Sequence, residues 1–110
     1  MINFAAFSDA MEGDDDMISM LIELYTVEHG DDVEKMKTLY ANDALEDLFM
    51  TVHSLKGVLL TLCEETATQQ LEAIEVLCKR GEKPAPNVMT EMYNEIKNIN
   101  DQVATLPIAN

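Results

Sequence analysis

Residues 42–63 read NDALEDLFMTVHSLKGVLLTLC, and a regular apolar stripe runs through this stretch. Asn42 or Asp43 is suited to begin a helix, because either side chain can accept a hydrogen bond from a backbone N–H group of the first turn. Steps of three and four residues are the spacing of a helix that buries one face against its neighbours. The sequence therefore predicts a helix over residues 43–63. Its stripe consists of Leu45, Leu48, Val52, Leu55, Leu59 and Leu62.

One histidine of this helix, His53, lies off the stripe. At about 100° per residue, it falls roughly 130° from the centre of the stripe, so its side chain is expected to face solvent. Lys56 and Gly57 follow one turn later, and Lys56 is the only basic residue between Lys37 and Lys79. A cation in this position could stabilise an anion carried on His53. Glycine inside a helix costs about 1 kcal/mol relative to alanine, and here it would let the backbone of another protein approach the histidine.

The neighbours of His53 on the helix surface form a candidate docking surface. Phe49, Met50 and Leu60 are apolar although they lie off the stripe. Apolar residues around an exposed polar residue favour contact with a partner. An alternative is that Phe49 and Leu60 only widen the buried face. From spacing alone, His53 could also be an ordinary exposed histidine. The candidate docking residues are Glu46, Phe49, Met50, Ser54 and Leu60.

The other segments are also predicted to be helical. A short helix within residues 2–11 would place two phenylalanines on a larger body, and residues 15–41 would form one long helix with a kink or break near Gly30. Glu64 and Glu65 open a helix that ends at Lys79-Arg80-Gly81, and a last helix is closed by Leu106 and Pro107. Short turns make successive helices antiparallel neighbours. We expect an all-α fold, an antiparallel four-helix bundle with a short additional N-terminal helix. Residues 1–110 would form a single domain with its core bundle at about 15–106.

Composition and charge exclude several classes of function. Apolar residues make up 47 % of the chain, Gly and Pro are scarce and Trp is absent, which favours an all-α domain. A net charge of −14 disfavours binding to nucleic acid or to an anionic membrane surface. We expect no signal peptide, because residues 1–16 lack a basic start and a long apolar core, and no apolar run reaches membrane-spanning length. Its two cysteines lack metal-ligand spacing and are expected to be free thiols, so a cytoplasmic protein is expected.

The segment around His53 resembles the histidine-containing phosphotransfer (HPt) domain family of bacterial multistep phosphorelays. That family has the pattern H-x-L-K-G, and this chain has His53-Ser54-Leu55-Lys56-Gly57. An apolar residue follows nine positions after the histidine, and Ile74-Glu75 stands where the family has Leu-Glu. The resemblance covers roughly residues 15–105. The chain departs from the pattern at Val58-Leu59-Leu60, where small residues are usual, at Cys63, where Gly is frequent, and at Ala67, where Leu is common.

The resemblance implies that His53 accepts a phosphoryl group from a receiver-domain aspartate and passes it to another receiver. Lys56 would offset the added negative charge, and Gly57 would give the receiver access. The Mg²⁺ that assists the transfer would belong to the receiver, so the chain would need no cofactor or metal of its own. No Gly-rich phosphate loop is present, so the chain is expected to be a phosphoryl carrier and not an enzyme that uses ATP. The expected partners are response-regulator receiver domains and a hybrid sensor histidine kinase, and the chain is expected to be a monomer.

Two alternatives come from other classes of protein. The first is a helical docking module that binds a receiver or a histidine kinase without carrying phosphate, for which Val58-Leu59-Leu60 is the reason. The second is a helical bundle that holds a metal or a redox centre, suggested by two His, two Cys and many carboxylates. Such a centre favours Glu-x-x-His pairs that face inward. Met50 precedes His53 at that spacing and Thr26 precedes His29, so the metal interpretation is the weaker one.

Overall fold

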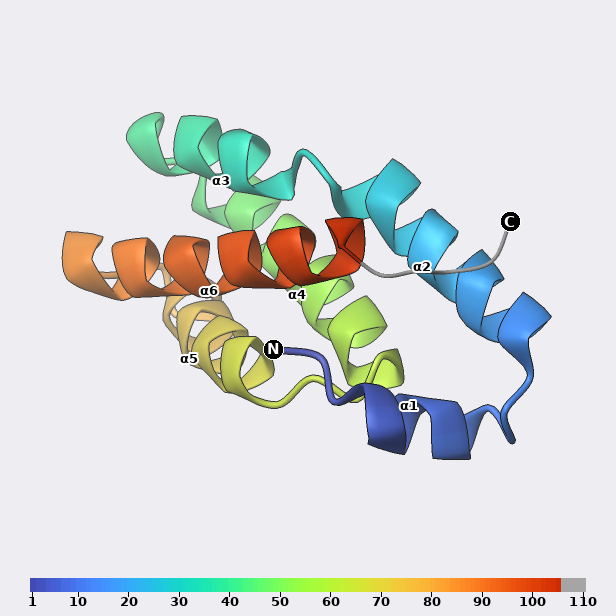
Figure 1. The fold of residues 1–110 in the computed structure, drawn as a ribbon. Helices are drawn as coiled ribbons and strands as arrows, with labels where there is room; N and C mark the ends of the chain where they lie inside the picture. The colour runs from blue at the N-terminus through green and yellow to red at the C-terminus, as the bar shows by residue number, and fades with distance from the viewer. Residues whose placement is uncertain (106–110) are drawn as a thin grey trace.

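The computed structural model describes residues 1–105, and this part of the chain is helical (Figure 1). The prediction of an all-α chain is confirmed, since the described residues hold no extended strand and only one isolated bridge, between Ile2 and Glu64. The predicted end of the last helix at Leu106 and Pro107 lies outside the described residues. The helices are α1 (Phe4–Ala10), α2 (Asp15–His29), α3 (Asp32–Ala41), α4 (Leu45–Thr61), α5 (Thr66–Lys79) and α6 (Pro86–Ala104).

Helix α4 occupies the centre of the fold. It packs against α3 on one side and α5 on the other, and α6 contacts both α5 and α3. Figure 1 shows α1 below the end of α4, while α2 extends to the right, away from the other helices. The helices α3 to α6 therefore make the most extensive helix contacts, and α1 and α2 contribute Phe7, Ile22 and Tyr25 to the same core.

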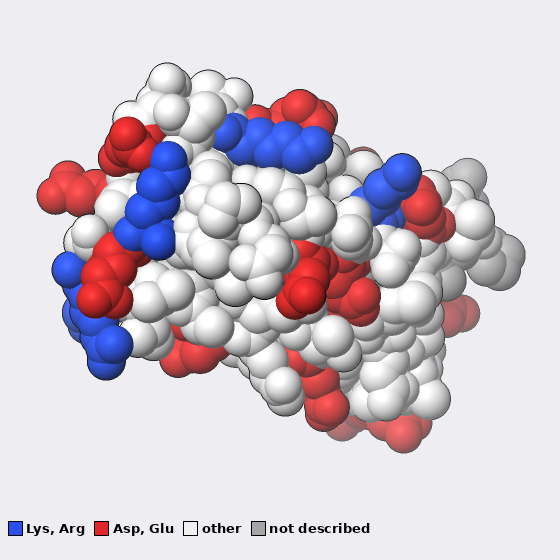
Figure 2. All heavy atoms as spheres, turned by 90° about the vertical axis from the view of Figure 1, so that its left-hand side faces the viewer, with Lys and Arg blue, Asp and Glu red and all other residues white. Residues whose placement is uncertain are grey.

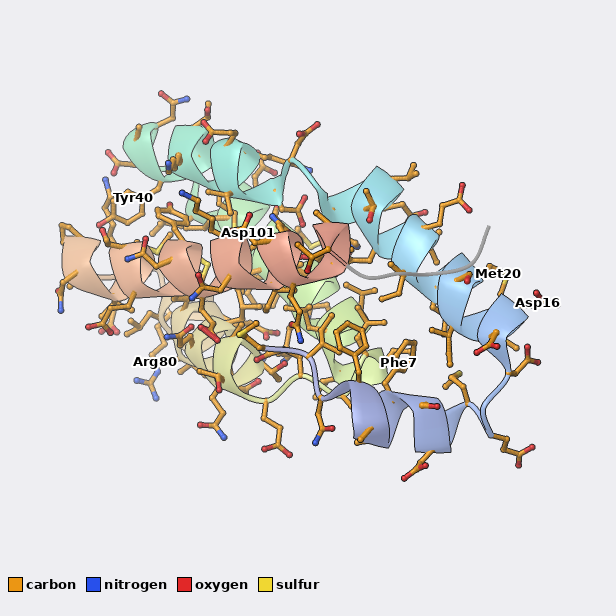
Figure 3. The ribbon with its side chains drawn as sticks, viewed as in Figure 1. Phe7, Asp16, Met20, Tyr40, Arg80 and Asp101 are labelled. Atoms are coloured by element: carbon orange, nitrogen blue, oxygen red, sulfur yellow. The ribbon has the colours of Figure 1, made fainter. Side chains whose placement is uncertain are left out.

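The apolar stripe of α4 is the centre of this core. Leu48, Val52, Leu55, Leu59 and Leu62 are fully buried, as the spacing predicts. Burial of each such side chain stabilises the fold by about 1.5–3 kcal/mol. Phe7 of α1 is also fully buried and points inward (Figure 3). The other helices contribute Ile22, Tyr25, Met36, Ala67, Leu71, Ile74, Met89, Met92, Ile96 and Ile99.

The predicted helix over residues 15–41 is divided into two. The break falls near Gly30 as expected, with α2 ending at His29 and α3 beginning at Asp32. His29 and Asp32 are both buried, and His29 Nδ1 lies 2.7 Å from Asp32 Oδ2. Tyr25 stacks on His29 and donates a hydrogen bond of 2.6 Å to Asn100 Oδ1 on α6. These contacts fix the turn between α2 and α3 and attach the end of α2 to the rest of the fold.

The start of α4 differs from the prediction, because neither Asn42 nor Asp43 is its N-cap. Ala44 holds that position, and no side chain caps the helix. Asp43 has a φ of 55°, and its carboxylate pairs with Lys83. At the other end of the helix, Cys63 has a φ of 59°. That left-handed conformation favours glycine, so Cys63 stands where glycine would fit best.

Helix α5 begins on a buried carboxylate. Glu64 is 1 % exposed, and its carboxylate accepts hydrogen bonds from the backbone N–H groups of Ala67 (2.8 Å) and Thr68 (2.9 Å). The predicted opening of this helix at Glu64-Glu65 is therefore correct, and Glu64 satisfies two N–H groups that have no partner within the helix. Within residues 1–105, none of the helices is both long and apolar enough to cross a membrane.

Candidate functional site

His53 lies in the middle of α4 on the face turned away from the core. Its side chain is 62 % exposed, which agrees with the outward position predicted from the spacing of the stripe. The neighbouring positions Val52 and Leu55 are fully buried, so the helix is fixed in rotation by its apolar face. An imidazole in this position is accessible to a partner protein.

Two side chains hold the His53 ring in place. Glu75 on α5 lies beside it, with 2.6 Å between His53 Nδ1 and Glu75 Oε1. Phe49, one turn earlier on α4, stacks on the ring with 5.9 Å between centroids and 10° between planes. Phe49 itself is half-buried and packs against the core. The imidazole is therefore oriented by one polar contact and one ring contact.

Lys56 belongs to the same cluster. Its Nζ atom lies 2.6 Å from Glu75 Oε2, and it donates a hydrogen bond of 2.6 Å to Glu72 Oε2. Glu75 therefore contacts His53 through one oxygen and Lys56 through the other. Its side chain is 12 % exposed, whereas that of Glu72 is 58 % exposed. The cation predicted beside His53 is present, and a shared carboxylate connects it to the histidine.

The electrostatics of the cluster keep both charged partners ionised. Burial of the Glu75 carboxyl acts to raise its pKa, but the ion pair with Lys56 and the contact with His53 outweigh this and leave the pKa below its ordinary value. Contacts with Glu72 and Glu75 raise the pKa of the Lys56 ammonium group. At neutral pH, Glu75 is therefore a carboxylate and Lys56 is a cation.

The ionised state of Glu75 determines which nitrogen of His53 can react. A carboxylate only accepts hydrogen bonds, so His53 Nδ1 must carry the hydrogen that it donates to Glu75 Oε1. In the neutral imidazole, Nε2 then holds the lone pair. The site therefore presents one defined nucleophilic nitrogen on an exposed ring.

Shallow hollows surround His53, and the predicted docking residues lie along them. Two of these hollows lie between α4 and α5, and a third lies between α4 and the turn from α2 to α3. Met50 and Leu60 are 64 % and 56 % exposed. The residues of α4 that line these hollows include Glu46, Phe49, Met50, Ser54, Lys56 and Leu60.

Gly57 faces open space beside this surface. A Cβ atom built on Gly57 would meet nothing within 4 Å. Tight packing inside the fold therefore does not explain this glycine, although glycine weakens the interior of a helix. The prediction that Gly57 points outward is correct.

The described part of the chain contains no group of three or more His, Cys, Asp or Glu side chains arranged to hold a metal ion.

Against protein-family models, residues 20–106 match the model described as Hpt domain. The chain belongs to the Hpt domain family. Hpt domains act in phosphorelays based on histidine phosphotransfer, with receiver domains and kinases as partners. No curated protein and no solved structure gives a significant match.

The departures from the Hpt pattern divide into buried and exposed positions. Leu59 is fully buried, and Val58 is half-buried and packs against the core. Only Leu60 of the three bulky residues after Gly57 is exposed. Cys63 lies at the left-handed end of α4, and Ala67 is buried near the start of α5. The departures therefore mainly change the packing of this Hpt domain, and Leu60 is the one that alters its outer surface.

Glu75 and Glu72 are the residues of the site that the sequence did not identify as functional. Glu75 lies 22 positions from His53 and reaches it only because α5 packs along α4. Its one signal was the match of Ile74-Glu75 to the Leu-Glu of the family. Glu72, one turn before Glu75, had no signal at all.

Proposed function

We propose that His53 accepts a phosphoryl group from the phospho-aspartate of one receiver domain and passes it to the aspartate of another. The contact between His53 Nδ1 and Glu75 Oε1 is the observation that carries this proposal. It leaves Nε2 as the nucleophile of an exposed imidazole, and nucleophilic attack requires the unprotonated nitrogen.

The transfer follows from this arrangement. Nε2 of His53 attacks the phosphorus atom, a P–N bond forms, and the P–O bond to the receiver aspartate breaks. The aspartate carboxylate leaves with the electron pair of that bond. The phosphorylated ring carries positive charge while Nδ1 keeps its hydrogen, and the ionised Glu75 carboxylate next to Nδ1 stabilises it. In the reverse reaction the same groups serve a second receiver.

Lys56 and Gly57 have supporting roles in this proposal. The Lys56 ammonium group offsets the negative charge of the phosphoryl group, and its pairing with Glu72 and Glu75 keeps it on this side of the helix. The open space at Gly57 admits the receiver. Phosphoryl transfer depends mainly on positioning and charge stabilisation, which these residues supply.

The rest of the proposal concerns partners and setting. The chain is proposed to be a carrier without its own ATP site, and a receiver domain supplies Mg²⁺. A hybrid sensor histidine kinase is the proposed source of the phosphoryl group. Cys63 and Cys78 are free thiols, which supports a reducing compartment such as the cytoplasm. We propose that α2 and α3 together take the place of the predicted helix over residues 15–41 and form the antiparallel bundle with α4, α5 and α6, and that residues 1–110 are one domain.

The experiment that tests the function is transfer from a labelled partner. Receiver domains from the same organism are phosphorylated with labelled phosphate, purified and mixed with the chain. We expect the chain to take up label that is stable in alkali and lost in acid, as for phosphohistidine. If the chain binds a receiver but takes no label from any of them, it is a docking module that carries no phosphate.

Glu75 is expected to control the rate of this transfer. Glu75→Ala frees the His53 ring and leaves Lys56 paired only with Glu72, so misplacement of the nucleophile should slow phosphoryl uptake roughly 10- to 100-fold. Single-turnover transfer from a phosphorylated receiver measures this rate. Glu72→Ala is the matched control, because Glu72 pairs with Lys56 and not with His53. Equal rates for the two variants would contradict a role of Glu75 in orienting His53.

Gly57 is expected to respond differently to small and large substitutions. Gly57→Ala fills empty space and improves helix propensity, so the free energy of unfolding should rise by about 0.5–1 kcal/mol. Gly57→Trp should fold but bind a receiver at least tenfold more weakly, because the indole ring occupies the approach to His53. Urea unfolding and titration with a receiver measure the two effects. Unfolding of the Trp variant would mean that Gly57 is needed for packing instead.

A further inference from the structure

Helix α2 has a second apolar face that no other helix covers. Ile22, Tyr25 and His29 are buried and attach α2 to the fold. The opposite side carries four exposed apolar residues, of which Val27 is 76 % and Met20 is 55 % exposed. Figure 3 shows Met20 and Asp16 on the outer side of α2, away from the remaining helices. We call this surface the α2 stripe; it consists of Met17, Met20, Leu24 and Val27.

The spacing of the α2 stripe is that of a helix-pairing seam. Its residues follow one another in steps of three, four and three. This is the spacing of the two apolar positions, a and d, in two successive heptads of a coiled coil. A helix that is apolar on all sides is normally covered on all sides. The α2 stripe is therefore suited to receive another helix along its length of about 16 Å.

The α2 stripe cannot fold back onto its own core without breaking other contacts. Tyr25 is bonded to Asn100 of α6, and His29 is bonded to Asp32 at the turn into α3. Both contacts lie on the side of α2 opposite to the stripe. Within residues 1–105 the stripe is therefore left open to a partner from outside.

The charges beside the α2 stripe define the chemistry of that partner. Asp16 and Glu23 flank the stripe on one side and Glu28 flanks it on the other, at the positions where coiled-coil helices exchange salt bridges. None of the seven Lys and Arg residues precedes Lys35, so α1 and α2 contain no Lys or Arg side chain. Figure 2 shows Lys and Arg side chains on the opposite end of the molecule, which is the left-hand end of Figure 1.

A second copy of the chain fits this surface poorly. Whether two α2 helices paired parallel or antiparallel, carboxylates would face carboxylates beside the seam, and like charges at these positions destabilise pairing. Lys or Arg at the same positions would form attractive pairs with Asp16, Glu23 and Glu28.

We propose that the α2 stripe binds an amphipathic helix of another protein, with an apolar stripe flanked by Lys or Arg. The four residues of the α2 stripe line none of the hollows around His53, although Glu28 beside the stripe also lines the hollow at Met50 and Ser54, and the proposal does not depend on phosphotransfer. Two heptads form a short seam, so the interaction is reversible on its own.

The probe is a synthetic helical peptide of about three heptads with Leu at the seam and Lys at the flanking positions. Fluorescence anisotropy measures its binding to the full chain. One control peptide has Glu in place of Lys. The other has the residues of the Lys peptide in scrambled order. We expect binding of the Lys peptide alone, weakened by added salt. No binding of the Lys peptide, or equal binding of the scrambled peptide, would overturn the proposal.

Variants locate the binding surface. Leu24→Ser with Val27→Ser should bind the Lys peptide at least tenfold more weakly, because two seam residues are lost. Met50→Ser with Leu60→Ser removes exposed apolar residues near His53 and should bind as the wild type does. If the Met50 and Leu60 variant lost binding while the Leu24 and Val27 variant kept it, the peptide would bind at the His53 site. That result would refute the assignment to α2. Circular dichroism of each variant confirms that helix content is unchanged.

Charge reversal and oligomeric state give two further tests. Glu23→Lys with Glu28→Lys should reverse the preference, so that the Glu peptide binds better than the Lys peptide. Sedimentation velocity should show that Leu24→Ser with Val27→Ser leaves the oligomeric state of the chain unchanged. A wild-type dimer that dissociates in this variant would make a second copy the natural occupant and would overturn the proposal.

Discussion

We expect His53→Gln to take up no phosphate from any phosphorylated receiver. Gln keeps a polar side chain of similar reach, but its amide nitrogen has no lone pair available for attack on phosphorus. His53 is exposed and contributes nothing to the apolar core, so the variant should fold as the wild type does. Gel analysis of labelled protein measures uptake, and thermal unfolding checks the fold. We expect complete loss of label with little change in the melting temperature.

His29→Gln is the matched control for this variant. The chain has two histidines, so the two single variants together test each imidazole in turn. His29 is buried against Asp32 and stacked on Tyr25, out of reach of a receiver aspartate. The His29 variant should lose some stability but retain label at a temperature where it is folded. Label that persists in His53→Gln and disappears in folded His29→Gln would move the site to His29.

Glu64→Ala is expected to cause a large loss of stability. The substitution leaves the N–H groups of Ala67 and Thr68 without partners, and the Ala67 bond is buried. Loss of a helix cap and of buried hydrogen bonds together cost about 3 kcal/mol. For a chain of this size, that lowers the melting temperature by roughly 15 °C. Differential scanning calorimetry or urea unfolding measures the change.

The neighbouring residue supplies the control for Glu64. Glu65 is exposed and makes no capping hydrogen bond with its side chain, although it occupies the N-cap position of α5. Glu65→Ala should therefore change stability by less than about 0.5 kcal/mol. Similar losses in both variants would mean that the negative charge near the helix start matters more than the hydrogen bonds of Glu64.

The sequence predicted α4 well because the regular stripe of this helix marks the face that is fully buried. Leu48, Val52, Leu55 and Leu59 fall on one side at helical spacing, and that alone placed His53 outside. Helix α2 is different, since apolar residues lie on two of its faces. Periodicity predicts such a helix but cannot tell which face is buried, because both satisfy the same spacing. The exposure of Met20 and Val27 could be learned only from the structure.

The polar contacts of the site were harder to predict than its histidine. The chain has 21 acidic residues, and only the match of Ile74-Glu75 to the Leu-Glu of the family pattern separates Glu75 from the rest. Its contact with His53 depends on the register of α5 against α4, which is set by buried residues such as Leu71 and Ile74. Glu64 was predicted near a helix start, where acidic residues are usually exposed. Its burial depends on contacts distant in sequence, so composition gave no sign of it.

The orientation of the His53 ring by Glu75 and Phe49 has a consequence for the direction of phosphate flow. The rotational entropy of this side chain is lost when the protein folds, so less of it remains to be lost when a receiver arrives. In the proposed function, donor and acceptor receivers would meet the same oriented imidazole, and each transfer step and its own reversal would pass through one transition state. The ring itself favours neither direction. Which receiver gains the phosphoryl group then depends on the relative free energies of the two aspartyl phosphates and on their concentrations.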